Sequence, residues 1–379
     1  MPAPFASRPA PKLVFGPGSL RELPACVREC GGSAVLLVSD AGLAQAGHID
    51  AARGLLEAAG LPVFAYDHSH ANPSEADAAA CADFARGRAF DCIVALGGGS
   101  SLDTAKAANF LLTNGGRMRD YHGYGKAAKP LLPLIAIPTT AGTGSECQSY
   151  ALVSRDDTHE KMACGDPKAR PQVALLDPDL TATLPRSVAV QTGLDALAHA
   201  LEAAVCTKRN PLSALYAEGA FRELAPALGA VLAGRPSAED RGRMLLGAAL
   251  SGLAIENSML GAAHATANPL TARYDVVHGY AVALMLPHVL RFNAAVPEAA
   301  ALYARFSTLL AELGVSPAPL DAWVDGLVGA AQIPPVTVPE SDWTALAQDA
   351  DRQWTGKFNP RPLQPADSVA LYRRVFGHA

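Results

Sequence analysis

The chain contains 379 residues, with 31 Lys and Arg, 36 Asp and Glu, a formal net charge of −5, and 50% hydrophobic residues. These values are typical of a globular protein with two domains. Lys and Arg are dispersed rather than clustered, which argues against a nucleic-acid partner. The long apolar stretches are interrupted by Gly, Pro or charged residues, which argues against a membrane span.

The cysteines and the N-terminal residues indicate a cytoplasmic protein. The seven Cys are odd in number, include no Cys-x-x-Cys pair and lie mostly in apolar runs, as expected of reduced thiols. Residues 1–11 are rich in Pro and Ala and lack the charged start and apolar centre of a signal peptide. We therefore expect a cytoplasmic location.

Short apolar runs that are typical of β-strands alternate with helical segments up to about Leu184. Their centres lie near Leu13, Val35, Val63, Ile93, Ile135, Leu152 and Val173. This alternation predicts an α/β fold with a doubly wound, mainly parallel sheet. We assign residues 1–184 to this dinucleotide-binding α/β domain.

The second of these runs, Ala34–Val38, ends in Ser39 and Asp40. A carboxylate at the carboxyl end of a strand can bond the adenosine ribose hydroxyls and repel a 2′-phosphate, which favours NAD(H) over NADP(H). The same carboxylate could instead cap the helix that follows. The sequence leaves both interpretations open.

A glycine turn follows the strand predicted over Phe90–Leu96. Gly97–Ser100 forms the turn, and Ser101–Leu112 reads as an amphipathic helix. Glycines let the backbone approach a pyrophosphate, and a helix N-terminus supplies unpaired N–H groups. The turn therefore indicates a phosphate site, although such turns are common in α/β proteins.

A second polar loop, Ile137–Ser145, follows the apolar strand Leu131–Ile137 and contains three Thr, one Ser and two Gly. These side chains and amides can bind phosphate, ribose or a carboxamide. The alternative is a capped turn without a ligand.

After Pro185 the pattern changes to helices alone, so we assign residues 185–379 to an all-helical domain. Helices are expected over Ser187–Val205, Leu212–Leu232, Arg241–Ser258 and Val282–Asn293. Arg235–Asp240 and Ile333–Pro339 are expected to be loops.

The helical half carries candidate metal ligands. Asp195 and His199 are four residues apart in an apolar run and therefore share one face of a helix. His264 lies in a second helical run, and His278 precedes Gly279, which suits a turn or a close backbone approach. One carboxylate and three imidazoles without a thiolate suit Fe²⁺ or Zn²⁺.

Each His alone could be a hydrogen-bonded core residue. Asp195 is harder to explain in that way, because a carboxylate in so apolar a segment must be paired or coordinated if it is buried.

Four motifs together resemble the iron-containing (group III) alcohol dehydrogenases. They are Gly97–Lys106, Pro138–Glu146, Thr192–Glu202, and His278-Gly279 with Leu286-Pro-His288. The similarity extends from about Phe15 to Asn359–Arg361, with the motifs in the family's order. It implies an NAD(H)-linked alcohol dehydrogenase or aldehyde reductase, an α/β domain followed by an all-helical metal domain, and a homodimer.

The resemblance also implies the site residues. The metal, Fe²⁺ with Zn²⁺ as the alternative, would be held at the catalytic centre by Asp195, His199, His264 and His278. The nucleotide would be contacted by Asp40, Asn72, Gly97, Gly98, Gly99, Ser100, Asp103, Thr139, Thr140, Thr143, Lys161 and Leu180. Hydride would pass between nicotinamide C4 and a small alcohol or aldehyde at the metal.

Three positions depart from the family. Asn268 stands where many members carry a His that is assigned to proton transfer or to the nicotinamide pocket. Glu256 adds a carboxylate near the metal motif, either as part of a proton relay or as a structural charge. Tyr150 replaces a smaller polar residue, which changes the shape of the pocket.

Two other functions are consistent with parts of the pattern. One is a cyclising lyase of the dehydroquinate synthase type, which uses a more basic pocket than the sparse Lys and Arg over His264–Tyr280 provide. The other is a nucleotide-binding pseudoenzyme, which would have no chemical need for four intact ligands.

Overall fold

The computed structural model describes residues 4–158 and 161–377 and divides the chain into two compact units. The first unit is Pro9–Leu184. The second is Pro185–Ala379 together with the N-terminal segment that ends at Arg8. Arg8 explains this grouping, because its backbone N–H donates to Oδ1 of Asn257 at 2.9 Å and its guanidinium pairs with the buried Glu256 at 3.1 Å.

The first unit contains a six-stranded sheet with strand order β1-β9-β6-β4-β2-β3, in which all pairs are parallel. This confirms the prediction of a doubly wound, mainly parallel sheet. The strands are β1 (Lys12–Phe15), β2 (Val35–Val38), β3 (Val63–Tyr66), β4 (Cys92–Gly97), β6 (Leu134–Pro138) and β9 (Val173–Leu176). The central strands are buried along their whole length, as their continuous apolar runs require.

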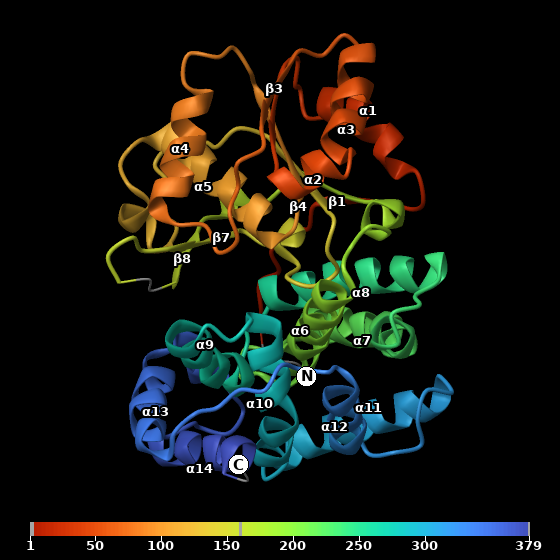
Figure 1. The fold of residues 1–379 in the computed structure, drawn as a ribbon, viewed down its shortest axis with the longest axis vertical. Coiled ribbons are helices and arrows are strands. Elements are labelled where there is room, and N and C mark those ends of the chain that lie inside the picture. Colours follow the sequence, from red (N-terminus) through yellow and green to blue (C-terminus); the bar gives the residue numbers. More distant parts are fainter. Residues whose placement is uncertain (1–3, 159–160, 378–379) are drawn as a thin grey trace. The chain divides into compact units, whose positions relative to one another are not determined.

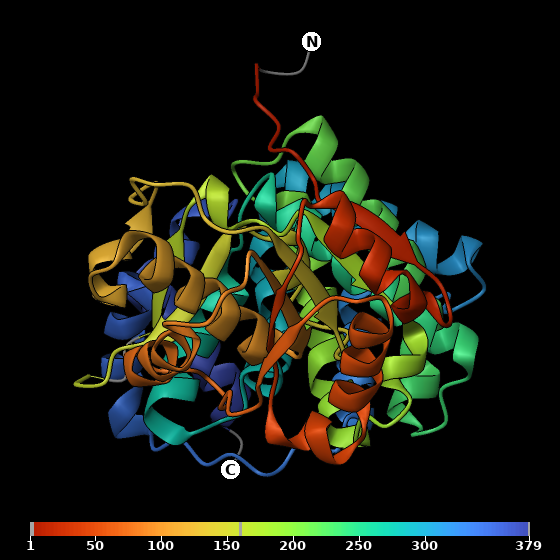
Figure 2. The same ribbon diagram turned by 90° about the horizontal axis from the view of Figure 1, so that it is seen from above.

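Helices cover both faces of this sheet (Figures 1 and 2). The helices are α1 (Leu23–Glu29), α2 (Ala41–Gln45), α3 (His48–Ala58), α4 (Glu75–Ala85) and α5 (Gly99–Asn114). Alternate residues of β2 belong to two separate cores: Leu36 and Val38 pack with α4 and α5, and Val35 and Leu37 pack with α1 and α3. Short 3₁₀ turns are η1 (Ser19–Glu22), η2 (Met118–Tyr121), η3 (Ser145–Cys147), η4 (Pro167–Ala169) and η5 (Pro178–Thr181).

The strand expected near Leu152 is present, but it lies outside the large parallel sheet. It forms β7 (Tyr150–Ser154), which pairs antiparallel with β8 (Lys161–Gly165) in a small sheet of order β5-β8-β7, with β5 at Gly123–Tyr124. The physical reason is visible in burial: β7 is buried at alternate residues, whereas the parallel strands β2 and β4 are buried throughout.

The described residues from Pro185 to Gly377 form helices and loops only, which confirms the all-helical second unit. The helices are α6 (Arg186–Val205), α7 (Pro211–Leu232), α8 (Ala238–Glu256), α9 (Ala262–Tyr274), α10 (His278–Asn293), α11 (Pro297–Glu312), α12 (Leu320–Ala330), α13 (Trp343–Arg352) and α14 (Pro365–Phe376), with 3₁₀ turns η6 (Glu340–Asp342) and η7 (Trp354–Phe358). The expected loop Arg235–Asp240 is shorter than predicted, because Ser237 and Asp240 form a capping box that begins α8 at Ala238.

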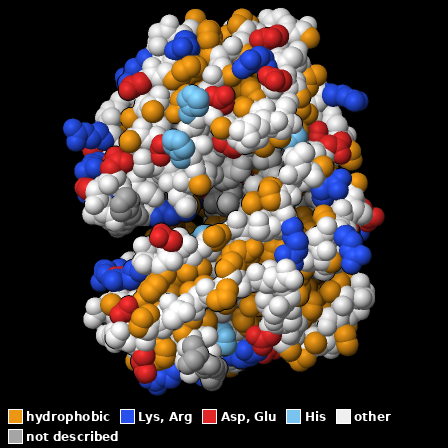
Figure 3. Space-filling model, viewed as in Figure 1, with side chains coloured by type: hydrophobic (Ala, Val, Ile, Leu, Met, Phe, Trp, Pro, Cys, Tyr) orange, Lys and Arg blue, Asp and Glu red, His pale blue; other side chains and the backbone are white. Residues whose placement is uncertain are grey.

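The surface carries charges of both signs. On the face shown in Figure 3, Lys and Arg lie among Asp and Glu. Within the described part of the chain, no helix combines the length and apolar character needed to cross a bilayer.

A close contact between α10 and α6 depends on one glycine. A Cβ at Gly279 would lie 2.2 Å from the backbone oxygen of Gln191 on α6, so no larger residue fits there without a backbone shift. The expected close backbone approach at Gly279 is confirmed, within the first turn of α10 rather than in a separate turn. This contact sets the position of the neighbouring His278 relative to α6.

Replacing Gly279 by Ala should therefore destabilise the helical unit by about 1–3 kcal/mol, because the atom it meets belongs to the backbone and cannot rotate away. Gly229→Ala is the matched control. Gly229 is an exposed glycine inside α7, and no neighbouring group lies within 4 Å of the added Cβ. It should be neutral or stabilising by up to about 1 kcal/mol. Urea unfolding of both variants measures the difference, and equal stabilities would contradict the close approach.

Candidate metal centre and nucleotide-binding loops

Three imidazoles from three helices surround one carboxylate oxygen. The Nε2 atoms of His264 on α9, His199 on α6 and His278 on α10 lie 3.2, 3.4 and 3.8 Å from Oδ1 of Asp195. The i,i+4 spacing on α6 brings Asp195 and His199 together, and the helix contact at Gly279 brings in His278. All four predicted ligands are therefore in one cluster.

This arrangement fits a divalent metal ion. Donor atoms of Asp195, His199 and His264 all lie within 4.8 Å of one another. Ligand atoms about 2.1 Å from one ion lie roughly 3–3.5 Å apart, close to the separations found here. One carboxylate oxygen accepts about two hydrogen bonds, so three imidazole nitrogens around it are better explained by a shared cation.

Because the cluster is buried, its charged groups need partners of opposite charge. Asp195, His199 and His264 are all buried, whereas the side chain of His278 is 28% exposed. Burial alone would raise the pKa of Asp195, but the neighbouring imidazoles, His199 first, hold it well below its ordinary value. Burial alone would lower the pKa of His264, but Glu202 and Asp195 together raise it to about 9. The surroundings of the cluster thus favour positive charge.

Glu202 is a site residue that the sequence reasoning missed. Its Oε2 lies 2.6 Å from Nδ1 of His264, and its Oε1 accepts the backbone N–H of Ala263 at 2.6 Å. A carboxylate that accepts a hydrogen bond from the Nδ1–H of His264 leaves Nε2 as the ligand atom that faces Asp195. The signal was present in the sequence, because Glu202 lies seven residues after Asp195 and therefore on the same face of an apolar helix.

The start of α9 is built around this contact. Oδ1 of Asn359 accepts the N–H of Ala262 at 3.1 Å, so Glu202 and Asn359 together bind the first two amides of α9. A Cβ at Gly261 would lie 2.8 Å from Asn359 and 3.0 Å from Glu202, so glycine is needed there. His264 is thereby fixed by both its side chain and its helix.

In the α/β unit, the two predicted nucleotide loops lie against each other. A Cβ at Gly99 would meet Cγ2 of Thr143 at 2.7 Å, and one at Gly98 would meet Cγ2 of Thr140 at 3.3 Å. The N–H of Thr139 donates to the carbonyl of Gly97 at 3.0 Å. The glycines thus let the turn pack against the polar loop, and both loops present backbone groups at the carboxyl ends of β4 and β6.

The glycine turn is shorter than expected, because α5 begins at Gly99 with Gly98 as its N-cap rather than at Ser101. Gly97 has φ of 153°, and a Cβ there would lie 2.5 Å from Oγ of Ser101. Asn72 has φ of 51° and donates its N–H to Oγ of Ser100 at 3.1 Å. These residues therefore meet at the N-terminus of α5.

Asp40 does cap the following helix: its Oδ1 accepts the N–H of Leu43 at 3.2 Å. Its Oδ2 also accepts a hydrogen bond from Oγ of Ser101 at 2.9 Å, which brings the carboxylate beside the glycine turn. The capping interpretation is confirmed, and the ribose contact that the resemblance implies stays a prediction.

The remaining predicted contacts are spread more widely. Asp103 is buried, accepts a hydrogen bond from Oγ of Ser145 at 2.7 Å, and has a raised pKa because of its burial. Lys161 is exposed at the first position of β8, and its charge acts on Asp103 to lower that pKa. Leu180 lies in η5, where it packs into the core beside α1 and α3.

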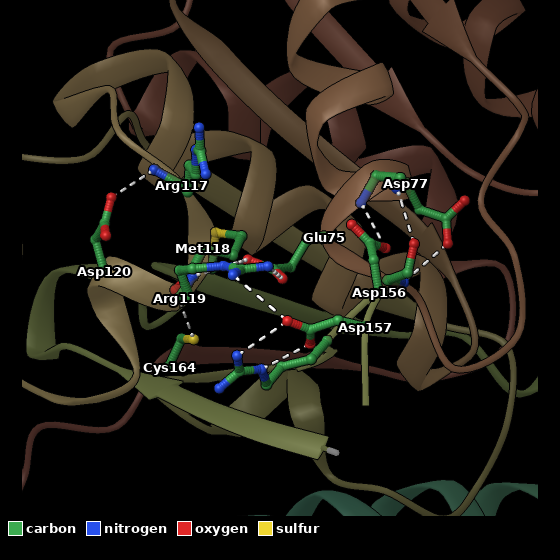
Figure 4. A network of polar contacts seen from close by, with 12 residues as sticks. Glu75, Asp77, Arg117, Met118, Arg119, Asp120, Asp156, Asp157 and Cys164 are labelled. Atoms are coloured by element: carbon green, nitrogen blue, oxygen red, sulfur yellow. Dashed lines mark hydrogen bonds and ion pairs between the residues drawn. The ribbon is translucent and has the colours of Figure 1, made fainter. Parts of the chain in front are cut away.

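The hairpin that carries Lys161 is tied to α4 (Figure 4). Arg119 holds both oxygens of Glu75, at 3.0 and 2.6 Å, and Asp157 lies 3.7 Å from the same guanidinium. Asp156 accepts a backbone N–H of α4 at 3.3 Å. This network ties Asp156 and Asp157 to α4 and to Arg119.

The three residues that depart from the family pattern each contact a neighbouring side chain. The Glu256 carboxylate is buried and ion-paired with Arg8, in agreement with a structural charge. Nδ2 of Asn268 donates to Oε1 of Gln353 at 2.9 Å. The ring of Tyr150 packs beside Tyr124, with ring centroids 5.7 Å apart, over Gly165.

Comparison with known proteins agrees with this geometry. Residues 10–178 match the model of iron-containing alcohol dehydrogenases, and residues 189–376 match the C-terminal model of the Fe-containing alcohol dehydrogenase family. Alcohol dehydrogenase 4 of Schizosaccharomyces pombe is 34% identical over 93% of this chain and 84% of that protein. The NAD-dependent methanol dehydrogenase of Bacillus methanolicus is 34% identical over 75% of this chain and 74% of its own length. The structure of a 1,3-propanediol oxidoreductase superposes with a TM-score of 0.91 at 30% identity, covering 99% of this chain and 100% of that one.

The chain combines a parallel sheet of the nucleotide-binding type with helices that bring one Asp and three His together. This combination is typical of a metal- and nucleotide-dependent oxidoreductase. The chain belongs to the iron-containing, NAD-dependent alcohol dehydrogenase family. The resemblance inferred from the sequence motifs is confirmed.

Removing the Glu202 carboxylate should weaken metal binding without removing a ligand. We expect Glu202→Ala to lower metal affinity about 10–100-fold, because His264 loses the group that orients it. Glu256→Gln is the control: it changes another buried carboxylate, one that pairs with Arg8. Chelator competition followed by metal analysis measures the affinities, and equal affinity in Glu202→Ala and wild type would remove Glu202 from this role.

Proposed function

We propose that this enzyme transfers hydride between C4 of NAD(H) and a small alcohol or aldehyde, with Fe²⁺ held by Asp195, His199, His264 and His278. The observation that carries the proposal is the convergence of three Nε2 atoms, from three helices, on one oxygen of Asp195. The wholly nitrogen and oxygen donor set suits Fe²⁺ and also accommodates Zn²⁺.

When bound, the metal supplies a Lewis acid that polarises a carbonyl or lowers the pKa of an alcohol. The protein's own contribution is to hold the donors in place. Glu202 keeps the proton of His264 on Nδ1, and the buried side chains of Asp195 and His199 exclude water from one side of the cluster. His278 is the most exposed of the four, so we infer that substrate approaches from its side.

The glycine turn supports the nucleotide half of the proposal. Gly97, Gly98 and Gly99 let the turn pack against the polar loop at the N-terminus of α5, where the helix dipole and the first amides would favour the negative charge of a pyrophosphate. Asp40 at the end of β2 provides the carboxylate that would accept ribose hydroxyls and repel a 2′-phosphate.

Proton release needs a different route from the one in relatives with a titratable His at the position of Asn268. Asn268 donates to Gln353, and Glu256 is held by Arg8, so neither favours a relay. We infer that the proton exchanges with water on the exposed side of His278, with the ribose hydroxyls as the other route.

We further propose a cytoplasmic homodimer. All seven cysteines are thiols outside any disulfide, which supports a reducing compartment. The family resemblance supports the dimer. At the edge of the large sheet, β1 carries the exposed Phe15, a suitable surface for a second copy.

The proposed reaction predicts NAD⁺-dependent oxidation of short alcohols by the Fe²⁺-loaded enzyme, followed as NADH absorbance. Asp195→Ala should lose bound metal and nearly all turnover while NADH still binds, because the nucleotide residues belong to the other unit. An enzyme that forms no NADH with any alcohol and reduces no aldehyde would contradict the proposal, and would favour the lyase or the pseudoenzyme. Full metal occupancy in Asp195→Ala would remove Asp195 from the site.

Asp40 should set the choice of cofactor. Wild type should prefer NAD(H), and Asp40→Gly should shift kcat/KM toward NADP(H), because the carboxylate repels a 2′-phosphate by about 1–3 kcal/mol at a partly exposed site. Asp40→Asn keeps a side chain that can cap α2 and so separates loss of charge from loss of the cap. A wild-type preference for NADP(H) would leave Asp40 as a helix cap only.

A further inference from the structure

Lys106 on α5 is a fully buried cation. None of its surface is exposed, and its Nζ, which carries three N–H donors, lies within hydrogen-bond distance of four oxygens: the carbonyl and hydroxyl of Ser145 at 2.6 and 2.8 Å, and the carbonyls of Gln148 and Tyr150 at 2.9 and 3.0 Å. A buried ammonium group is costly unless its hydrogens are bonded. All four acceptors come from one short segment, Ser145–Tyr150, so the lysine holds that segment against α5.

The segment held by Lys106 is the continuation of the polar nucleotide loop. Nε2 of Gln148 donates to the carbonyl of Thr143 at 2.8 Å, and the N–H of Ser145 points to Oγ1 of the same Thr143 at 3.4 Å. Thr143 in turn packs against Gly99 at the start of α5. Contacts from Lys106 therefore reach the glycine turn through two residues.

Ser145 also joins Lys106 to a second nucleotide position. Its hydroxyl accepts from Lys106 and donates to Oδ1 of Asp103 at 2.7 Å. Asp103 lies one helical turn before Lys106, and the positive charge of Lys106 offsets part of the cost of burying that carboxylate. The lysine thus fixes the orientation of Asp103 as well as that of Thr143.

We propose that Lys106 is a positioning residue of the nucleotide site, which holds Thr143 and Asp103 in place from beneath while it remains shielded from the nucleotide. This inference rests on the proposed nucleotide site in the α/β unit. Lys106 acts through hydrogen bonds to the loop, and it is separate from the metal cluster, whose residues all belong to the helical unit.

The test uses the metal-loaded enzyme and NADH as the probe. Lys106→Met keeps the length of the side chain and removes its donors, and it should raise the Kd for NADH about tenfold or more, since at least one charge-assisted hydrogen bond to the loop is lost. KM for NAD⁺ should rise, while KM for the alcohol and the metal content per chain stay at wild-type values. Lys129→Met, at an exposed lysine of the same unit, should leave all four quantities unchanged.

The outcomes separate this inference from the proposed function. A wild-type enzyme that does not bind NADH would contradict the nucleotide site and this inference together. Normal NADH binding by Lys106→Met would overturn the role of Lys106 alone, whereas joint loss of NADH and metal binding would show that this variant does not fold. If Lys106→Met does not fold, Ser145→Ala decides: it removes the hydroxyl that joins Lys106 to Asp103, and an unchanged Kd for NADH would overturn the proposal.

Discussion

The buried carboxylate of Asp195 is the constraint on which the helical unit depends. A lone charge in the apolar helix α6 would be costly, and the protein compensates by directing three imidazoles at one oxygen. This requires α9 and α10 to meet α6 at fixed positions, which explains a glycine at 279 and a second buried carboxylate, Glu202, beneath His264. The chemistry expected of the family follows from this arrangement of charges.

In the α/β unit, the backbone rather than charged side chains brings the two predicted nucleotide loops together. Three consecutive glycines allow the start of α5 to lie against the polar loop, and the loop is held from below by a buried cation. In both units the groups that are proposed to bind a ligand are held by residues behind them: Glu202 for His264, and Lys106, through Ser145 and Gln148, for Thr143. Supporting residues of this kind limit the motion of the groups in front, so that binding costs less conformational entropy.

Much of this could be predicted from the sequence, because the relevant signals are local. Continuous apolar runs predicted the parallel strands, and the four-residue spacing of Asp195 and His199 predicted half of the metal cluster. The pairing of strands that are distant in the sequence was harder to predict. The segment near Leu152 forms an antiparallel hairpin with a strand whose sequence has little β character. Glu202 and Lys106 were missed because their partners, 62 and 39 or more residues away, are set by tertiary packing.

We propose that Asp195 and three imidazoles hold one divalent ion, and X-ray absorption at the iron edge of the Fe²⁺-loaded protein is the test. We expect one ion per chain with imidazole nitrogens and carboxylate oxygen at about 2.0–2.2 Å and no sulfur ligand. An ion that is absent after loading, or coordinated without imidazole, would contradict it.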